Sequence, residues 1–236
     1  MPVGLIALII VAILVYFGLL HRALDRMRLS DKGALAVILA IVVGSIANIR
    51  LAGPPNEFLV NVGGALVPIG IVVYLLVTAD ETRERQRGVF AALVSGIAIY
   101  AASRLLPAGP EQPGTILDPV FVFALIAGTV GYLTGRSRRS AFIGGTMGII
   151  LGDVLHFIES RGAGAPSRTW VGGAGGFDTV ILAGVIAVGL AEIVGEILER
   201  VHRESKAGGT EVASLLVDEA GAEGQASEGG GEESEQ

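Results

Sequence analysis

The sequence predicts an all-α polytopic integral membrane protein with seven transmembrane helices, and three observations support this fold class. The chain of 236 residues is 51% hydrophobic and only 17% charged, whereas soluble domains carry about 25% charged residues. Its apolar residues gather in long blocks that are nearly free of charge, and about 20 such residues suffice to cross a bilayer as a helix. Clusters of basic residues follow every second block, as is typical of cytoplasmic loops.

Seven apolar blocks predict the membrane spans. They lie near residues 3–20, 34–52, 58–78, 89–106, 117–135, 141–158 and 179–198. The first block is not expected to be a cleaved signal peptide, because no basic residue precedes it and no small-x-small site follows it. The transmembrane domain is therefore predicted to cover residues 1–203.

Basic residues predict the orientation of these spans. Thirteen of the 17 follow spans one, three, five and seven: Arg22, Arg26, Arg28, Lys32, Arg83, Arg85, Arg87, Arg136, Arg138, Arg139, Arg200, Arg203 and Lys206. Because loops rich in Lys and Arg stay in the cytoplasm, the N-terminus is predicted outside and the C-terminus inside the cell membrane.

The last segment, residues 204–236, differs in composition from the rest. After Lys206 it holds eight acidic residues and no basic one, among many Gly, Ser and Ala residues. Such a segment cannot bury enough apolar surface to fold, so the sequence predicts an acidic, disordered cytoplasmic tail.

Several kinds of chemistry are disfavoured by composition. Cysteine is absent, which excludes disulfides, thiolate nucleophiles and thiolate metal sites. The glycine runs carry no adjacent Lys-Ser/Thr, so they do not predict a nucleotide-phosphate loop. No nucleic-acid partner is expected, no motif identifies a cofactor, and the oligomeric state is left open.

Polar side chains within or at the ends of the spans are the candidate binding residues, because such groups are costly in a bilayer. They are Asn48, Asn61, Asp118, Asp153, His156 and Asp178. At about 1.5 Å per helical residue, all six fall in the outer half of the membrane. Asp153 and His156 are three residues apart and share a helix face. The pattern predicts a polar chamber open to the outside, with Asp153 at its floor.

Each candidate also has a purely structural explanation. Asp118 and Asp178 each stand at the start of a span, where an aspartate caps a helix. Asn48 and Asn61 are equally explained as hydrogen bonds between helices. Asp153 and His156 together are also explained as a buried structural pair.

Three functions remain open on these residues. The leading hypothesis is binding or transport of a small polar solute, proton or divalent cation, with Asp153 as its centre. The enzymatic alternative is an intramembrane aspartyl protease using Asp153 and Asp178. Leu151-Gly152-Asp153 resembles the end of the Gly-x-Gly-Asp motif of presenilin-like proteases, with Ile150 in place of the first glycine. The third hypothesis is a non-catalytic membrane scaffold.

Two short segments suggest an internal repeat. Val62-Gly-Gly-Ala65 opens span three, and Val171-Gly-Gly-Ala174 precedes span seven, 109 residues later. A parallel duplication of three spans predicts this spacing, and chance similarity in an apolar sequence also explains it. The segment 171–177 is either a flexible loop or backbone that enters the protein interior. In the first case Asp178 lies about 10 Å further out than Asp153.

Several strings of the sequence resemble an uncharacterised family of multi-pass membrane proteins from bacteria and archaea. They are His21-Arg-Ala-Leu-Asp-Arg-Met-Arg28, Gly44-Ser-Ile-Ala-Asn-Ile49, Asn61-Val-Gly-Gly-Ala-Leu-Val-Pro68, Gly152-Asp153 and Gly172-Gly-Ala-Gly-Gly-Phe-Asp178. The resemblance covers roughly residues 1–200 and excludes the tail. It implies a prokaryotic cytoplasmic membrane and no particular activity.

Overall fold

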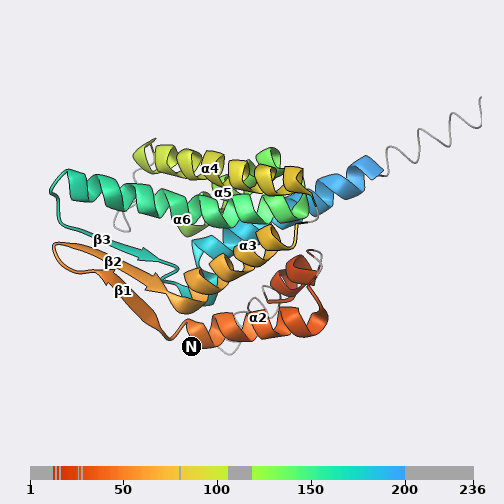
Figure 1. Cartoon of the computed structure of the whole chain (residues 1–236), viewed down its shortest axis with the longest axis horizontal. Helices are drawn as coiled ribbons and strands as arrows, with labels where there is room; N and C mark the ends of the chain where they lie inside the picture. The colour runs from red at the N-terminus through yellow and green to blue at the C-terminus, as the bar shows by residue number, and fades with distance from the viewer. Residues whose placement is uncertain are drawn as a thin grey trace, which may run out of the picture. The chain divides into compact units, whose positions relative to one another are not determined.

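The computed structural model describes residues 17–25, 29–79, 81–105 and 119–199, together with Ile13, Val15 and Met27. These residues are mostly helical and include one three-stranded sheet (Figure 1). The helices are a segment at 17–25, α2 (Asp31–Gly44), α3 (Val67–Val77), α4 (Thr82–Leu105), α5 (Pro119–Gly135), α6 (Arg138–Gly162) and a last helix, Thr179–Glu199. The chain divides into two units, residues 1–192 and 193–236. Most of predicted span 3–20 and the predicted tail 204–236 lie outside the described residues.

Within the described residues, three helices are long and apolar enough to cross a membrane: α4, α6 and Thr179–Glu199. They coincide with the predicted spans 89–106, 141–158 and 179–198. α5 is apolar but shorter. α2 exposes large apolar side chains, including Leu35, Leu39 and Val43, which water would disfavour and lipid would solvate. The protein is therefore membrane-embedded.

The expectation of a wholly helical protein is wrong for two of the predicted spans. Span 34–52 is helical only as far as Gly44 and then continues into strand β1 (Asn48–Ala52). Span 58–78 begins in strand β2 (Asn56–Asn61), passes through one π-helical turn (Val62–Leu66) and only then forms α3. Residues 48–61 hold no long apolar run that favours a helix, and a Gly-Pro-Pro turn between β1 and β2 lets the two strands pair.

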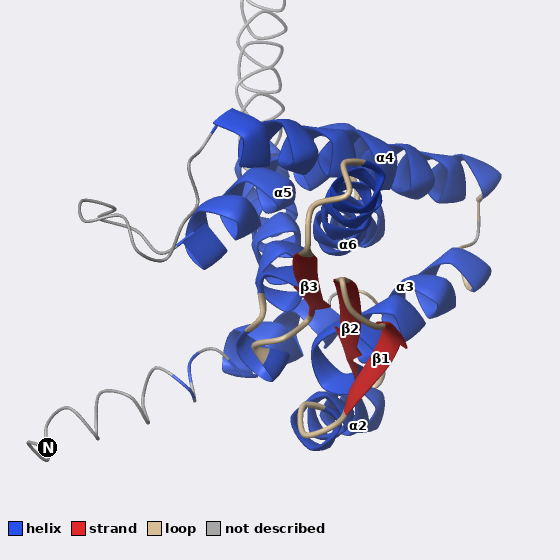
Figure 2. Cartoon of the chain, turned by 90° about the vertical axis from the view of Figure 1, so that its left-hand side faces the viewer, coloured by secondary structure: helices blue, strands red, loops and turns tan. Residues whose placement is uncertain are grey.

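The sheet has the order β1-β2-β3, where β3 is Ser167–Val171. β1 and β2 are antiparallel, and β2 and β3 are parallel with Val60 opposite Val171. The strands lie between α6 and α2 in both views (Figure 1, Figure 2). Phe58 of β2 packs its ring 4.8 Å from the ring of Phe157 on α6. β2 is partly to fully buried, whereas β1 at the sheet edge is mostly exposed.

A glycine junction follows the two parallel strands. Both β2 and β3 run into a Gly-Gly-Ala segment, and Gly64 and Gly172 lie so close that a Cβ on either would overlap backbone of the other segment. Gly172 has a φ of 72°, which glycine adopts without strain. The two similar segments thus pack against each other through their glycine backbones.

Small residues hold the helices of the first unit at close distance. A Cβ on Gly144 of α6 would lie 2.8 Å from Ala91 of α4 and 2.8 Å from Gly131 of α5. Gly145 of the same helix faces the carbonyl of Ala183 on the last helix. Such contacts allow backbones to approach closely, which is how membrane helices associate in the absence of a hydrophobic driving force.

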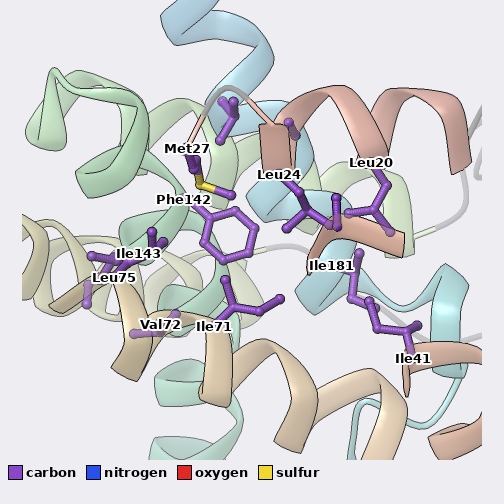
Figure 3. Close-up of a cluster of buried hydrophobic side chains, with 14 residues drawn as sticks. Leu20, Leu24, Met27, Ile41, Ile71, Val72, Leu75, Phe142, Ile143 and Ile181 are labelled. Carbon is purple, nitrogen blue, oxygen red and sulfur yellow. The ribbon is translucent and has the colours of Figure 1, made fainter. Parts of the chain in front are cut away.

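A cluster of buried hydrophobic side chains joins the N-terminal part of the chain to α6. Phe142 of α6 is surrounded by residues from the segment 17–25, α2, α3 and the last helix (Figure 3). The labelled members are Leu20, Leu24, Met27, Ile41, Ile71, Val72, Leu75, Phe142, Ile143 and Ile181. This core fixes the position of α6, the helix that carries Asp153.

Candidate functional site

A cavity of about 350 Å³ brings several of the predicted residues together. α4, α5, α6, β3 and the start of the last helix all contribute to its wall. The lining residues are Ile99, Ser103, Phe123, Ile149, Gly152, Asp153, His156, Trp170, Asp178 and Thr179. Its size falls in the range of sites that enclose small molecules.

Asp153 and His156 reach the cavity from one face of α6. Asp153 is half-buried, His156 is exposed, and the two are almost one helical turn apart. Gly152 precedes Asp153, and its missing side chain allows Ile99 of α4 to lie against the α6 backbone. Within the described residues, no N–H or O–H group donates a hydrogen bond to the Asp153 carboxylate.

Asp178 reaches the same cavity from the other side. It precedes the last helix, and its Oδ1 accepts a hydrogen bond from the Val180 N–H at 2.9 Å while Oδ2 accepts one from the Ala174 N–H at 3.1 Å. Asp178 therefore caps the N-terminus of the last helix and also holds the backbone of the preceding glycine-rich segment at Ala174. Burial raises the pKa of its carboxyl, and these two hydrogen bonds lower it in part. Asp153 is close enough for the two carboxylates to interact electrostatically.

The glycine-rich segment explains how Asp178 comes near Asp153. Val171 and Gly172 are buried against the π-helical turn after β2. The start of the segment, at Val171 and Gly172, therefore enters the protein interior, as one of the two interpretations of the sequence predicts, while Ala174 and Phe177 are exposed. Asp178 follows this segment and lines the same cavity as Asp153.

Asn48 and Asn61 lie in the sheet and do not line the cavity. Asn61 is 1% exposed and donates hydrogen bonds to the Ser45 carbonyl and to Asn48 Oδ1, both at 2.9 Å. Its own Oδ1 accepts from the Gly64 N–H at 2.7 Å and caps the π-helical turn. These contacts support the structural explanation of Asn61. Asp118 lies outside the described residues.

Trp170 connects this network to the cavity. Its Nε1–H donates to Asn48 Oδ1 at 3.0 Å, and its ring forms part of the cavity wall. By sequence alone, a tryptophan between two predicted spans is expected only to anchor the chain at the membrane interface. Its place beside Asp153 depends on the pairing of β3 with β2, and no local signal reveals that pairing.

A polar cluster lies on the same two helices as much of the cavity wall. Glu159 of α6 accepts a hydrogen bond from the Tyr100 hydroxyl at 2.9 Å and forms an ion pair with Arg104. Ser103, a neighbour of Arg104 on α4, lines the cavity. The cluster joins α4 to α6, and the positive charge of Arg104 is paired with the carboxylate of Glu159.

A metal centre is not supported by the described residues. They contain no group of three or more His, Asp and Glu side chains arranged to hold one ion. The single histidine and the two aspartates of the cavity thus fall short of the ligand number expected for a bound divalent metal.

Comparison with known proteins gives a family and no activity. Residues 45–190 match a family described as a protein of unknown function, DUF1614. The chain belongs to the DUF1614 family. Searches of curated proteins and of solved structures each found no match.

The DUF1614 segment includes all ten of the described residues that line the cavity, together with the three strands and the glycine junction. It begins at Ser45, directly after α2, and ends within the last helix. The resemblance to an uncharacterised family, expected from the sequence, is thus confirmed over residues 45–190. The cavity belongs to the part of the chain that defines DUF1614.

Proposed function

We propose that this DUF1614 protein binds a small polar solute or cation in the cavity beside Asp153 and moves it across the cell membrane. The observation that carries the proposal is the cavity itself, which collects Asp153, His156 and Asp178 from separate parts of the chain. Ionisable groups facing a cavity inside a membrane protein are typical of solute and proton pathways.

The broken segments around the site support transport over a scaffold role. β2 and β3 are extended segments that lead into short helical turns and then into helices. Transporters commonly place their substrate near such interrupted segments, where free backbone groups and helix ends are available. A scaffold needs neither a cavity nor carboxylates that line it.

Thermal unfolding of the detergent-purified protein tests binding directly. Small polar solutes, Na⁺ and divalent cations are added in turn, and we expect at least one to raise the melting temperature of the native protein. Asp153→Asn is expected to abolish that shift, because the amide cannot neutralise a cation or exchange a proton. Glu192→Gln is the matched control: Glu192 forms an ion pair with Arg138 at 2.6 Å and does not line the cavity.

The ligand that shifts the melting temperature is then used in a flux assay with proteoliposomes. Transport is supported if the Asp153→Asn variant no longer takes up the ligand while the Glu192→Gln variant takes it up like the native protein. A native protein whose stability responds to none of these compounds contradicts the proposal and favours the scaffold.

An aspartyl protease is the second candidate, because Asp153 and Asp178 line one cavity. Aspartic proteases use two carboxylates that share a proton. This function predicts cleavage of a membrane-spanning peptide that is lost equally in Asp153→Asn and Asp178→Asn. A single active variant excludes the dyad.

The proposal includes seven membrane crossings, with the N-terminus outside and the C-terminus in the cytoplasm. The native chain has no cysteine, so single cysteines report on topology. Gly53→Cys, in the turn after β1, is expected to react with an impermeant maleimide in intact cells. Glu81→Cys, just before α4, is expected to react only after the cells are opened. The reverse pattern would contradict this orientation.

A further inference from the structure

We propose that the ligand of the cavity is a small organic ammonium ion, held by Asp153 and Asp178 through charge and by the rings of Trp170 and Phe123. This inference rests on the proposed function and names the chemical class of its substrate. It depends on three properties of the cavity: the sign of its charge, the few ligands available to a metal ion, and its aromatic wall.

The charged groups of the cavity favour a cation. Asp153 and Asp178 are its two carboxylates, His156 is its one basic side chain, and neither Lys nor Arg is among its described lining residues. The two arginines nearest in sequence to its walls have acidic partners. Arg104 pairs with Glu159, and Arg168 Nε lies 3.4 Å from Glu57 Oε2. An anion in the cavity would therefore meet two carboxylates and no lysine or arginine among the described lining residues.

The arrangement of oxygens favours an organic cation over a metal ion. Both carboxylate oxygens of Asp178 accept backbone hydrogen bonds, while Asp153 accepts none within the described part of the chain. One such carboxylate pairs with an ammonium group, whereas Ca²⁺ and Mg²⁺ need about six oxygen ligands. The rest of the wall includes Ile99 and Ile149, which suit the alkyl groups of an organic ion.

Trp170 provides a fixed aromatic surface. Its Nε1–H is held by Asn48 Oδ1, and a Cβ on Gly173 would lie 2.9 Å from the ring, so the glycine allows the ring to lie against the backbone. The guanidinium of Arg168 lies 5.5 Å from the ring centroid, so the ring already makes a cation–π contact within the chain, and a ligand in the cavity has to share the ring with Arg168. Phe123 adds a second ring to the wall. Alkylammonium ions are bound by such rings together with carboxylates.

Trp170 is also the only tryptophan in the chain, so all tryptophan fluorescence comes from this residue of the cavity wall. The full-length protein in detergent is titrated with tetramethylammonium chloride, with sodium chloride, sodium acetate and glycerol as comparison solutes at matched ionic strength. We expect a saturable change in Trp170 emission and a higher melting temperature with tetramethylammonium only.

Single substitutions test whether the aromatic residues of the cavity wall bind tetramethylammonium. Trp170→Leu and Phe123→Leu are each expected to weaken tetramethylammonium binding roughly three- to thirtyfold, as judged by the thermal shift. Trp170→Phe keeps a ring and is expected to retain most of the binding while losing the fluorescence. Phe157→Leu is the matched control, since Phe157 packs on Phe58 and does not line the cavity.

The outcomes separate this inference from the proposed function. Binding of Na⁺, acetate or glycerol in place of tetramethylammonium would overturn the inference and leave a binding site in the cavity. Equal binding by Trp170→Leu, Phe123→Leu and Phe157→Leu would overturn the role of the aromatic wall. No response to any solute, including the divalent cations of the wider panel, would contradict the proposed function as well.

Discussion

Replacing Gly172 with alanine is expected to destabilise the protein by about 2–5 kcal/mol, because two penalties add. Gly172 has a φ of 72°, which costs other residues free energy. An added Cβ would also lie 2.5 Å from the carbonyl carbon of Gly64 and 2.6 Å from the backbone nitrogen of Ala65. Both neighbours are backbone atoms, so no side chain can move aside to relieve the overlap.

Unfolding of the detergent-purified variant by heat or by a denaturing detergent measures this loss. Gly189→Ala is the matched control, because a Cβ at Gly189 of the last helix meets no atom within 4 Å. That control is expected to keep or slightly raise the stability, since alanine favours a helix. Equal melting temperatures of the Gly172→Ala and Gly189→Ala variants would show that the close approach of Gly64 and Gly172 does not require glycine at position 172.

Replacing Asn61 with alanine is expected to cost about 2–5 kcal/mol. The side chain is 1% exposed, and its loss removes the hydrogen bonds to the buried Gly64 N–H and to the part-buried Ser45 carbonyl. Each buried group without a partner costs about 1–3 kcal/mol. The same unfolding measurement in detergent detects the change.

Asn56→Ala provides the comparison at the other end of β2. The Asn56 amide donates to the Ala165 carbonyl and to Ser167 Oγ in a more exposed setting, where water can replace it. We expect a loss below about 1 kcal/mol there. Similar stability of the two variants would argue that Asn61 is not the structural residue that its contacts indicate. A folded Asn61→Ala that no longer responds to ligand would assign it a role in binding.

Much of the helical part of the structure could be predicted from composition and periodicity. α4, α6 and the last helix each contain a long apolar block, and a run of that length has one favourable structure in a membrane. The same argument fails for residues 48–61, because these strands are only five and six residues long and include Arg50 and Glu57, so no long apolar run favours a helix there. Only pairing with a distant segment, β3, decides between a strand and a helix.

Part of the candidate site could be predicted in the same way. Asp153 and His156 share one helix, so their spacing alone puts them on one face. Their neighbours in the cavity could not be predicted so simply. Trp170 and Asp178 lie on a segment whose position depends on the parallel pairing of β2 with β3.

The sequence by itself determined that the protein is membrane-embedded, where three of its long helices lie, and which ionisable groups an apolar environment must accommodate. The physical reason is that hydrophobicity and helical spacing are local properties of the chain. Only the tertiary structure decided that Asp178 lies in the cavity of Asp153 while Asn61 lies in the sheet. That result depends on the contact between Gly64 and Gly172, which are distant in sequence and can meet only because neither has a side chain.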